Sequence, residues 1–324
     1  MSLSVGIVGL PNVGKSTLFN ALLKQQVALA ANYPFATIEP NVGIAQVPDD
    51  RLPKLAEVVH TSVIKPATVE FVDIAGLVKG ASTGEGLGNQ FLSHIREVDA
   101  MCFVLRDFSD PDIIRRDSTD PKSDLEILRL ELQLADEQTL AKHEKSKNQD
   151  KENLPLFAKK PFFVAINVDE GELVRSAQYA GKYAEELGIK VEQIVIVSAK
   201  IESELSSLSE EDQKEYMKDI GIEKSGLQRL AETAYKTLHL QSFLTAGEME
   251  VRAWTIPDSA TAVEASGVIH TDFMKKFIKA NVASYDDFIA LGGWKGVREA
   301  GKMRIEGRDY LMRDGDVVEF MIGN

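Results

Sequence analysis

The stretch that decides the fold is residues 9–17, which read GLPNVGKST and match the pattern G-x-x-x-x-G-K-[S/T]. The apolar run Val5–Val8 before it predicts a short buried strand, and Leu18–Leu23 after it predicts a helix. In this context the glycines let the backbone wrap around phosphate oxygens, and the helix presents its positive end to the same anion. The stretch therefore predicts a site for a nucleoside triphosphate.

Within this loop, Lys15 would span the β- and γ-phosphates, and Ser16 would ligate Mg²⁺ through its hydroxyl group. The loop residues that we expect to contact the nucleotide are Asn12, Val13, Gly14, Lys15, Ser16 and Thr17. A glycine-rich turn that carries Gly-Lys-Ser by chance is the alternative, but it leaves the flanking strand and helix unexplained.

The bulk composition favours a multidomain protein of the cytoplasm. A chain of 324 residues predicts two or three domains, and 44% hydrophobic with 27% charged residues is ordinary for a globular protein. The lone Cys102 allows no disulfide framework, which fits a reducing cytosol. We see no signal peptide and no membrane span. A net charge of −13 argues against non-specific binding of nucleic acid by the whole surface but does not exclude a local basic patch, and we expect no DNA partner.

Two segments after the loop indicate a nucleotide-dependent switch. Residues 31–40 form a loop in which Thr37 would complete the Mg²⁺ shell and sense the γ-phosphate. A predicted strand at Ala67–Val72 leads into Asp73, which would hold Mg²⁺ through water. Three residues later, the N–H group of Gly76 would contact the γ-phosphate, which is typical of GTPase-type switches rather than metabolic kinases.

The residue after this D-x-x-G pattern is Leu77, at the place where many such enzymes carry a glutamine that orients the attacking water. Leucine cannot hydrogen-bond to water, so either another group positions the water or hydrolysis is slow without a partner. The candidate catalytic residues are Lys15, Gly76 and Leu77.

The segment NVDE at residues 167–170 stands where guanine-specific proteins carry N-K-x-D. Glu170 replaces the aspartate that pairs with the guanine edge, and Val168 replaces the lysine whose stem packs on the base. Loss of the paired aspartate removes the polar complementarity that discriminates for guanine. We therefore favour adenine, with Asn167, Val168 and Glu170 around the base.

A second segment favours the opposite base. Residues 198–200 read Ser-Ala-Lys, which is typical of the loop near the guanine O6 atom, so Ser198 and Ala199 are further candidate nucleotide contacts. The absent aspartate weighs more in our interpretation because it is the specificity group itself. A GTPase of the same switch class stays open as an alternative.

Two regions remain. A helix over 124–147 has an apolar stripe, and with the charged segment 151–160 it predicts an inserted helical hairpin, or else one amphipathic helix packed on the sheet. From Phe243 onward a small α+β domain is expected, with a helix at 269–278 and a strand at 309–312 among its elements. Residues 275–313 hold nine Lys or Arg against five Asp or Glu, which allows either an ordinary solvated surface or contact with RNA phosphates.

Taken together, these motifs resemble the YchF family, the Obg-like ATPase branch of the translation-factor GTPases. The resemblance covers essentially the whole chain, and it is carried by residues 9–17, 31–40, 73–88, 167–170, 251–254, 269–273 and 314–316. It implies an α/β fold with a Ras-like P-loop NTPase domain at 1–123 and 161–242. It also implies an inserted helical arm at 124–160 and a C-terminal TGS domain of β-grasp fold at 243–324.

The resemblance further implies hydrolysis of ATP in preference to GTP, with Mg²⁺, binding to the ribosome (the large subunit or the whole particle, including its rRNA) and a link to stress responses. Members carry a hydrophobic residue in place of the catalytic glutamine, as Leu77 shows. This chain departs from the family in its short arm. It also departs in Arg115, which stands where some relatives carry a histidine; an arginine cannot act as a base but can stabilise transition-state charge. A nucleotide-sensing scaffold without turnover is the remaining alternative, motivated by Leu77.

Overall fold

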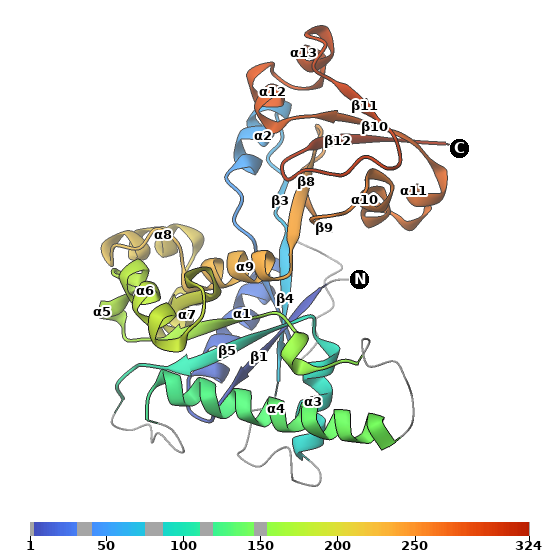
Figure 1. Cartoon of the computed structure of the whole chain (residues 1–324). Helices are drawn as coiled ribbons and strands as arrows, with labels where there is room; N and C mark the ends of the chain where they lie inside the picture. The colour runs from blue at the N-terminus through green and yellow to red at the C-terminus, as the bar shows by residue number, and fades with distance from the viewer. Residues whose placement is uncertain (1–2, 31–40, 75–86, 111–118, 146–153, 324) are drawn as a thin grey trace. The chain divides into compact units, whose positions relative to one another are not determined.

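The computed structural model describes residues 3–30, 41–74, 87–110, 119–145 and 154–323. These residues form two compact units, one from Met1–Ala45 and Val69–Thr237 and the other from Gln46–Thr68 and Leu238–Asn324 (Figure 1). The predicted site residues that lie outside the described residues are Thr37, Gly76, Leu77 and Arg115. Among the described helices, none combines the length and the apolar character that crossing a bilayer requires.

The first unit is built on a six-stranded sheet in the order β2-β4-β1-β5-β6-β7. The strands are β1 (Ser4–Gly9), β2 (Val42–Gln46), β4 (Thr68–Asp73), β5 (Ala100–Arg106), β6 (Phe162–Asn167) and β7 (Ile194–Val197). Parallel pairing joins β4 to β1, β1 to β5, β5 to β6 and β6 to β7. Strands β5 and β7 are buried throughout, which explains their continuous apolar sequences.

Helices cover this sheet. They are α1 (Lys15–Ala30), α3 (Leu87–Glu97), α4 (Pro121–Lys145), α5 (Glu170–Leu173), α6 (Ser176–Leu187), α7 (Ala199–Leu205), α8 (Glu210–Asp219) and α9 (Gly226–Thr237), with short 3₁₀ turns at Phe157–Lys159 and Val191–Gln193. Contacts join α1 to β1, α4 to β5, and both α6 and α9 to β7. The alternation of strand and helix confirms the predicted α/β class with a phosphate loop after the first strand.

The long helix α4 runs alongside β5 (Figure 1). Its apolar stripe is buried and consists of Leu125, Leu128, Leu132 and Ala135. Leu130, on the other side, is 55% exposed. Within the helix, the carboxylate of Asp136 accepts hydrogen bonds from the backbone N–H groups of Phe157 and Ala158, each at 2.9 Å. The described part of this region is therefore an amphipathic helix packed on the sheet, with a 3₁₀ turn at Phe157–Lys159 where a second helix was expected.

The second unit holds a six-stranded sheet in the order β11-β10-β12-β8-β9-β3. Its elements are α2 (Arg51–Val59), β3 (Ile64–Lys65), β8 (Leu240–Ala246), β9 (Val251–Pro257), α10 (Ala262–Ile269), α11 (Thr271–Lys276), β10 (Phe277–Ala283), α12 (Tyr285–Ala290), α13 (Trp294–Glu299), β11 (Arg304–Glu306) and β12 (Val317–Ile322). Its core on one face of the sheet includes Phe243, Ile256, Ala262, Phe277 and Val318.

Two predicted elements of this unit are wrong. The helix expected over 269–278 ends at Lys276, because Phe277–Ala283 pairs with β11 and β12 as a strand. The strand expected over 309–312 is absent from the structure; there Leu311 forms one isolated bridge to Thr261. In both places pairing with distant residues, rather than local propensity, decides the conformation.

The units also divide the chain differently from the predicted domain boundaries, which placed residues 46–68 in the nucleotide-binding domain. In the structure these residues group with the C-terminal unit, because β3 pairs in parallel with β9, Ile64 opposite Val251 and Lys65 opposite Arg252. Helix α2 completes the attachment by burying Leu52 and Leu55 and by contacting β8, β9 and α12.

Candidate nucleotide-binding site

The predicted site residues of the first unit meet at one edge of its sheet. The phosphate loop follows β1, Asp73 ends β4, Asn167 ends β6, and Ser198 follows β7. Because β1, β4, β6 and β7 run parallel, their carboxyl ends lie at the same edge. In open α/β sheets, ligands bind in the crevice outside these carboxyl ends.

The phosphate loop has the backbone conformation that a cradle for anions requires. Asn12 and Gly14 adopt positive φ values of 65° and 90°, which reverse the chain just before α1 begins at Lys15. The φ of 90° is one that side chains rarely tolerate, and a Cβ atom on Gly14 would also collide with the carboxamide of Asn167. Val13 is buried beneath the loop, and Ser16 and Thr17 are exposed at its end.

Lys15 and Asp73 form an ion pair, which joins the loop to the end of β4. The side chain of Lys15 is only 10% exposed and that of Asp73 is 27% exposed. The carboxylate thus balances the charge of the lysine that would meet the phosphates. Backbone pairing also holds Asp73, since its N–H group donates to the Asn41 carbonyl at 3.0 Å.

The residues present fit Mg²⁺. This ion prefers oxygen ligands and takes one or two protein oxygens together with phosphates and waters. Ser16 offers an exposed hydroxyl at the start of α1, and Asp73 offers a carboxylate beside Lys15. Among the described residues there is no cluster of three or more His, Cys, Asp or Glu side chains that could hold a metal. With Mg²⁺ bound, the ion would neutralise phosphate charge, and Ser16 and Asp73 would hold it.

Asn167 connects the two loops on which a nucleotide would rest. Its Nδ2 atom donates to the Val13 carbonyl at 2.9 Å, and its Oδ1 atom accepts from the Ala199 N–H group at 2.9 Å. The side chain is 4% exposed, so both bonds lie in the interior. Asn167 therefore fixes the spacing between the phosphate loop and the segment Ser198–Lys200.

The other predicted base contacts occupy different environments. Val168 is 1% exposed and its N–H group donates to the Val197 carbonyl at 2.8 Å, so its side chain belongs to the core. Glu170 is exposed as the first residue of α5. Ser198 and Ala199 are buried at the start of α7. Of these four residues, only Glu170 is exposed, so its carboxylate faces solvent.

Sequence reasoning missed the residues that brace this segment from the loop after β5. The N–H group of Asp107 donates to the Asn167 carbonyl at 2.8 Å, and that of Ser109 donates to the Asp169 carboxylate at 3.0 Å. Asp169 also forms a capping box with Glu172 at the start of α5. The D-E-x-E spacing at this helix start was the signal that could have found Asp169.

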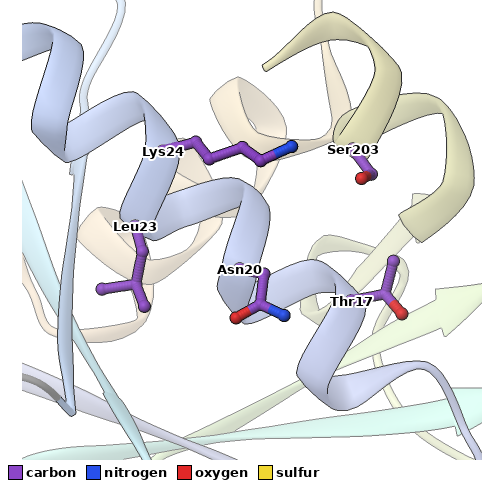
Figure 2. Close-up of a pocket in the computed structure, with 5 residues that line it drawn as sticks. All are labelled: Thr17, Asn20, Leu23, Lys24 and Ser203. Carbon is purple, nitrogen blue, oxygen red and sulfur yellow. The ribbon is translucent and has the colours of Figure 1, made fainter. Parts of the chain in front are cut away.

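A hollow of about 350 Å³ lies between α1 and α7, and Thr17 is one of its lining residues (Figure 2). Its other lining residues are Asn20, Leu23, Lys24 and Ser203. Figure 2 shows Thr17, Asn20 and Lys24 along one helix with Ser203 on the facing one. The polar spacing of positions 17, 20 and 24 on one helix was the signal for this wall. The hollow adjoins the phosphate loop but is lined mainly by exposed polar side chains.

Just after residues 198–200, here called the base segment, Glu202 on α7 is a buried carboxylate that accepts hydrogen bonds from the N–H groups of Gly226 at 2.6 Å and Leu227 at 3.2 Å. It thereby caps the start of α9 and holds α7 in place. Burial raises the pKa of Glu202, although these N–H groups and Arg229 oppose the shift.

A phosphate loop paired with the end of β4, and an asparagine that joins it to the base segment, define a P-loop NTPase domain of the nucleotide-switch class. Family models agree with this class. The model described as 50S ribosome-binding GTPase matches residues 4–167, and a YchF-GTPase C-terminal model, described as a protein of unknown function, matches residues 240–323. The chain belongs to the YchF family.

Relatives that match over their full length carry this family name. Proteins of Bacillus subtilis and Escherichia coli O157:H7, each named ribosome-binding ATPase YchF, are both 44% identical, with 99% of either chain covered. The solved structure of a Schizosaccharomyces pombe protein, described as the YchF GTPase, has a TM-score of 0.83 and 34% identity, covering 99% of this chain and 98% of that one. The B. subtilis alignment runs over 363 positions, more than the 324 residues of this chain, so it contains gaps in this chain.

Proposed function

We propose that this protein is an ATP-hydrolysing P-loop switch that binds ribosomes and acts in translation or stress regulation, in the cytoplasm. Relatives 44% identical over nearly their whole length are named ribosome-binding ATPases, which supports both activities. The observation that carries the proposal is the Asn167 carboxamide, held between Val13 and Ala199 at 2.9 Å from each. It supports a nucleotide laid across the phosphate loop and the base segment.

In this proposal Lys15 leaves Asp73 to bind the β- and γ-phosphates, and Ser16, Thr37 and Asp73 hold Mg²⁺. The N–H groups of Asn12–Thr17 surround the phosphates. The base lies against Asn167, Ser198 and Ala199. Val168 packs in the core beneath this contact surface, and Glu170 lies at its exposed edge. Gly76 and Leu77 complete the part of the site around the γ-phosphate. Because Leu77 stands in place of a glutamine, its side chain cannot orient the attacking water.

Adenine is the preferred base in this proposal because the guanine-pairing aspartate is replaced by Glu170, which starts α5 and is exposed. The test is a titration of ATP and GTP side by side under one Mg²⁺ concentration. We expect ATP to bind more tightly, and GTP binding at least about tenfold tighter than ATP, a difference of about 1.4 kcal/mol, would overturn the choice of base.

A GTPase of the same class is the second candidate, favoured by the Ser198-Ala199-Lys200 segment. The ribosome and its rRNA are the proposed partners, and the second unit, with its basic stretch 275–313, is the proposed RNA-facing part. Turnover measured with and without ribosomes tests this: we expect slow basal hydrolysis that ribosomes stimulate. A near-zero basal rate without stimulation would instead support a nucleotide-sensing scaffold.

A further inference from the structure

The chain leaves the first unit between two neighbouring strands of its nucleotide-binding sheet. β2 ends at Gln46 and β4 begins at Thr68, and these strands are adjacent in the sheet. The residues between them, 47–67, are here called the connecting segment. Its two ends meet, since the Val47 N–H group donates to the Ala67 carbonyl at 2.8 Å. The connecting segment therefore leaves and re-enters the first sheet at neighbouring strands, and its own residues belong to the second unit.

Side chains and backbone bind the connecting segment to the second unit. The Val251 N–H group donates to the Val63 carbonyl at 2.9 Å, next to the β3–β9 pairing. Lys65 forms an ion pair with Glu250, and Thr61 Oγ1 donates to the Met249 carbonyl at 3.4 Å. Attachment through strand pairing, buried leucines and ion pairs makes the segment part of this unit rather than a surface loop.

Arg51 is the best-placed polar anchor. Its Nη1 atom lies 2.8 Å from Asp314 Oδ2, and its Nη2 atom lies 2.8 Å from Asp49 Oδ2. Asp314 in turn accepts the Ser242 N–H group at 3.0 Å, where β8 runs. A Cβ atom on Gly315, where φ is 80°, would lie 2.6 Å from Arg51 Nη1, so a glycine makes room for the guanidinium.

The far end of β4 lies at the candidate nucleotide site. β4 pairs with β1 from Ser4↔Glu70 to Ile7↔Asp73 and ends at Asp73, the partner of Lys15. A β-strand is almost fully extended, because each residue already spans close to its maximal ~3.3–3.6 Å. β4 is therefore a continuous extended strand from Thr68, next to the connecting segment, to Asp73.

We propose that the connecting segment couples the nucleotide site to the second unit, so that the nucleotide bound at the phosphate loop alters the second unit and a partner on that unit alters the nucleotide site. The inference rests on the proposed function for its nucleotide. Exchange of the Lys15–Asp73 pair for phosphate and Mg²⁺ supplies the displacement, and Arg51 is a positioning residue that transmits it. Coupling between two binding sites is reciprocal by thermodynamic necessity.

Amide hydrogen exchange of the full chain tests the coupling without any ribosome. The states compared are Mg²⁺ with a non-hydrolysable ATP analogue and Mg²⁺ with ADP. In the unmodified protein we expect exchange differences at the phosphate loop, in the connecting segment and in β9. In Arg51→Ala we expect the phosphate-loop differences to persist and those in β9 to fall to less than half. Asp314→Asn, a milder change, serves if Arg51→Ala folds poorly.

Arg298→Ala is the matched control, because Arg298 pairs with Glu319 at 3.2 Å within the same unit and is not part of the connecting segment. We expect it to keep the unmodified pattern. Differences that stop at residue 45 in the unmodified protein, or that are unchanged in both Arg51→Ala and Asp314→Asn, overturn the coupling while leaving the proposed function intact. A phosphate loop whose exchange is the same with the ATP analogue, with ADP and without nucleotide overturns the proposed function, and this inference with it.

Ribosome binding gives a second readout. We expect the ratio of ribosome affinities in the ATP-analogue and ADP states to move toward one in Arg51→Ala, and the effect of ribosomes on nucleotide affinity to shrink by the same factor. Equal ratios in Arg51→Ala and the unmodified protein contradict the coupling.

Discussion

Asn167 and Val13 stand 154 positions apart, yet the Asn167 carboxamide donates a 2.9 Å hydrogen bond to the Val13 carbonyl within the phosphate loop. The same side chain accepts the Ala199 N–H group. One buried amide thereby ties the end of β6 to the loop after β1 and to the start of α7. Nucleotide binding and the stability of the first unit should therefore share a dependence on this residue.

The substitution Asn167→Ala leaves the Val13 carbonyl and the Ala199 N–H group buried without partners. We expect it to lower the free energy of unfolding by about 1–3 kcal/mol for each such group and to weaken nucleotide binding. Denaturant unfolding with and without ATP and Mg²⁺ measures both effects. Asn20→Ala, an exposed change on α1, is the control and should leave stability almost unchanged. Equal stability of the two variants would show that the bridge is dispensable.

Gly14→Ala should abolish nucleotide binding. At φ 90° an added Cβ atom strains the backbone by about 1–2 kcal/mol, and it also collides with the Asn167 carboxamide. Gly171→Ala is the matched control, because nothing lies within 4 Å of its added Cβ atom at the start of α5. We expect the control to bind nucleotide normally in an equilibrium titration. Normal ATP affinity in Gly14→Ala would contradict the cradle geometry.

Asp73→Asn tests the contribution of the metal ion to ATP binding separately from that of the phosphate loop. It keeps the shape of the side chain but removes the charge that pairs with Lys15 and would hold Mg²⁺. In the unmodified protein we expect Mg²⁺ to tighten ATP binding by about tenfold or more, and in the variant by much less. Titrations of ATP with Mg²⁺ and with a chelator measure the difference. Asp99→Asn, whose carboxylate caps the Ser4 N–H group at 2.8 Å, should behave as the unmodified protein.

The single thiol reports on unfolding of the first unit. Cys102 lies in β5 and is 0% exposed, and burial raises the pKa of its thiol well above the usual range. We expect a thiol reagent at pH 8 to leave the native protein unlabelled for hours and to label one thiol per chain in denaturant. Rapid labelling under native conditions would mean that β5 opens readily.

The buried carboxylate of Glu202 predicts a pH dependence of stability. Because burial raises its pKa in the folded protein, the folded state holds this proton more tightly than the unfolded state does. Its contribution to stability is therefore fully present below the unfolded pKa of about 4.3 and is lost as the pH rises through the raised value.

Urea unfolding between pH 4 and pH 7.5 tests this for the unmodified protein and for Glu202→Gln. We expect the stability advantage of glutamate over glutamine to shrink as the pH rises. Glu204→Gln is the control, since Glu204 is exposed and accepts the Tyr216 hydroxyl at 2.9 Å. An advantage that grows with pH would show that the hydrogen bonds from Gly226 and Leu227 outweigh the cost of burial.

Several elements could be predicted because their signals are local. The phosphate loop carries its own glycines, and the strand and helix on either side follow from short apolar runs. The apolar stripe of α4 from Leu125 to Ala135 was also predictable. The sequence left open whether this helix belongs to a hairpin or packs on the sheet, and in the described residues it packs on the sheet. By contrast, the helix expected over 269–278 extended into Phe277 and Ile278, and only pairing with β11 and β12 makes these residues part of a strand.

The sequence by itself determined the chemistry of the first unit: a loop for phosphates, a carboxylate at the end of β4 and an altered base-recognition segment. These are properties of residue type at short spacing. Only the tertiary structure decided that residues 46–68 belong to the second unit. The pairing that places them there is a two-residue strand, β3, against a strand almost 190 residues later. So short a strand has no periodicity of its own, and its conformation comes from its distant partner.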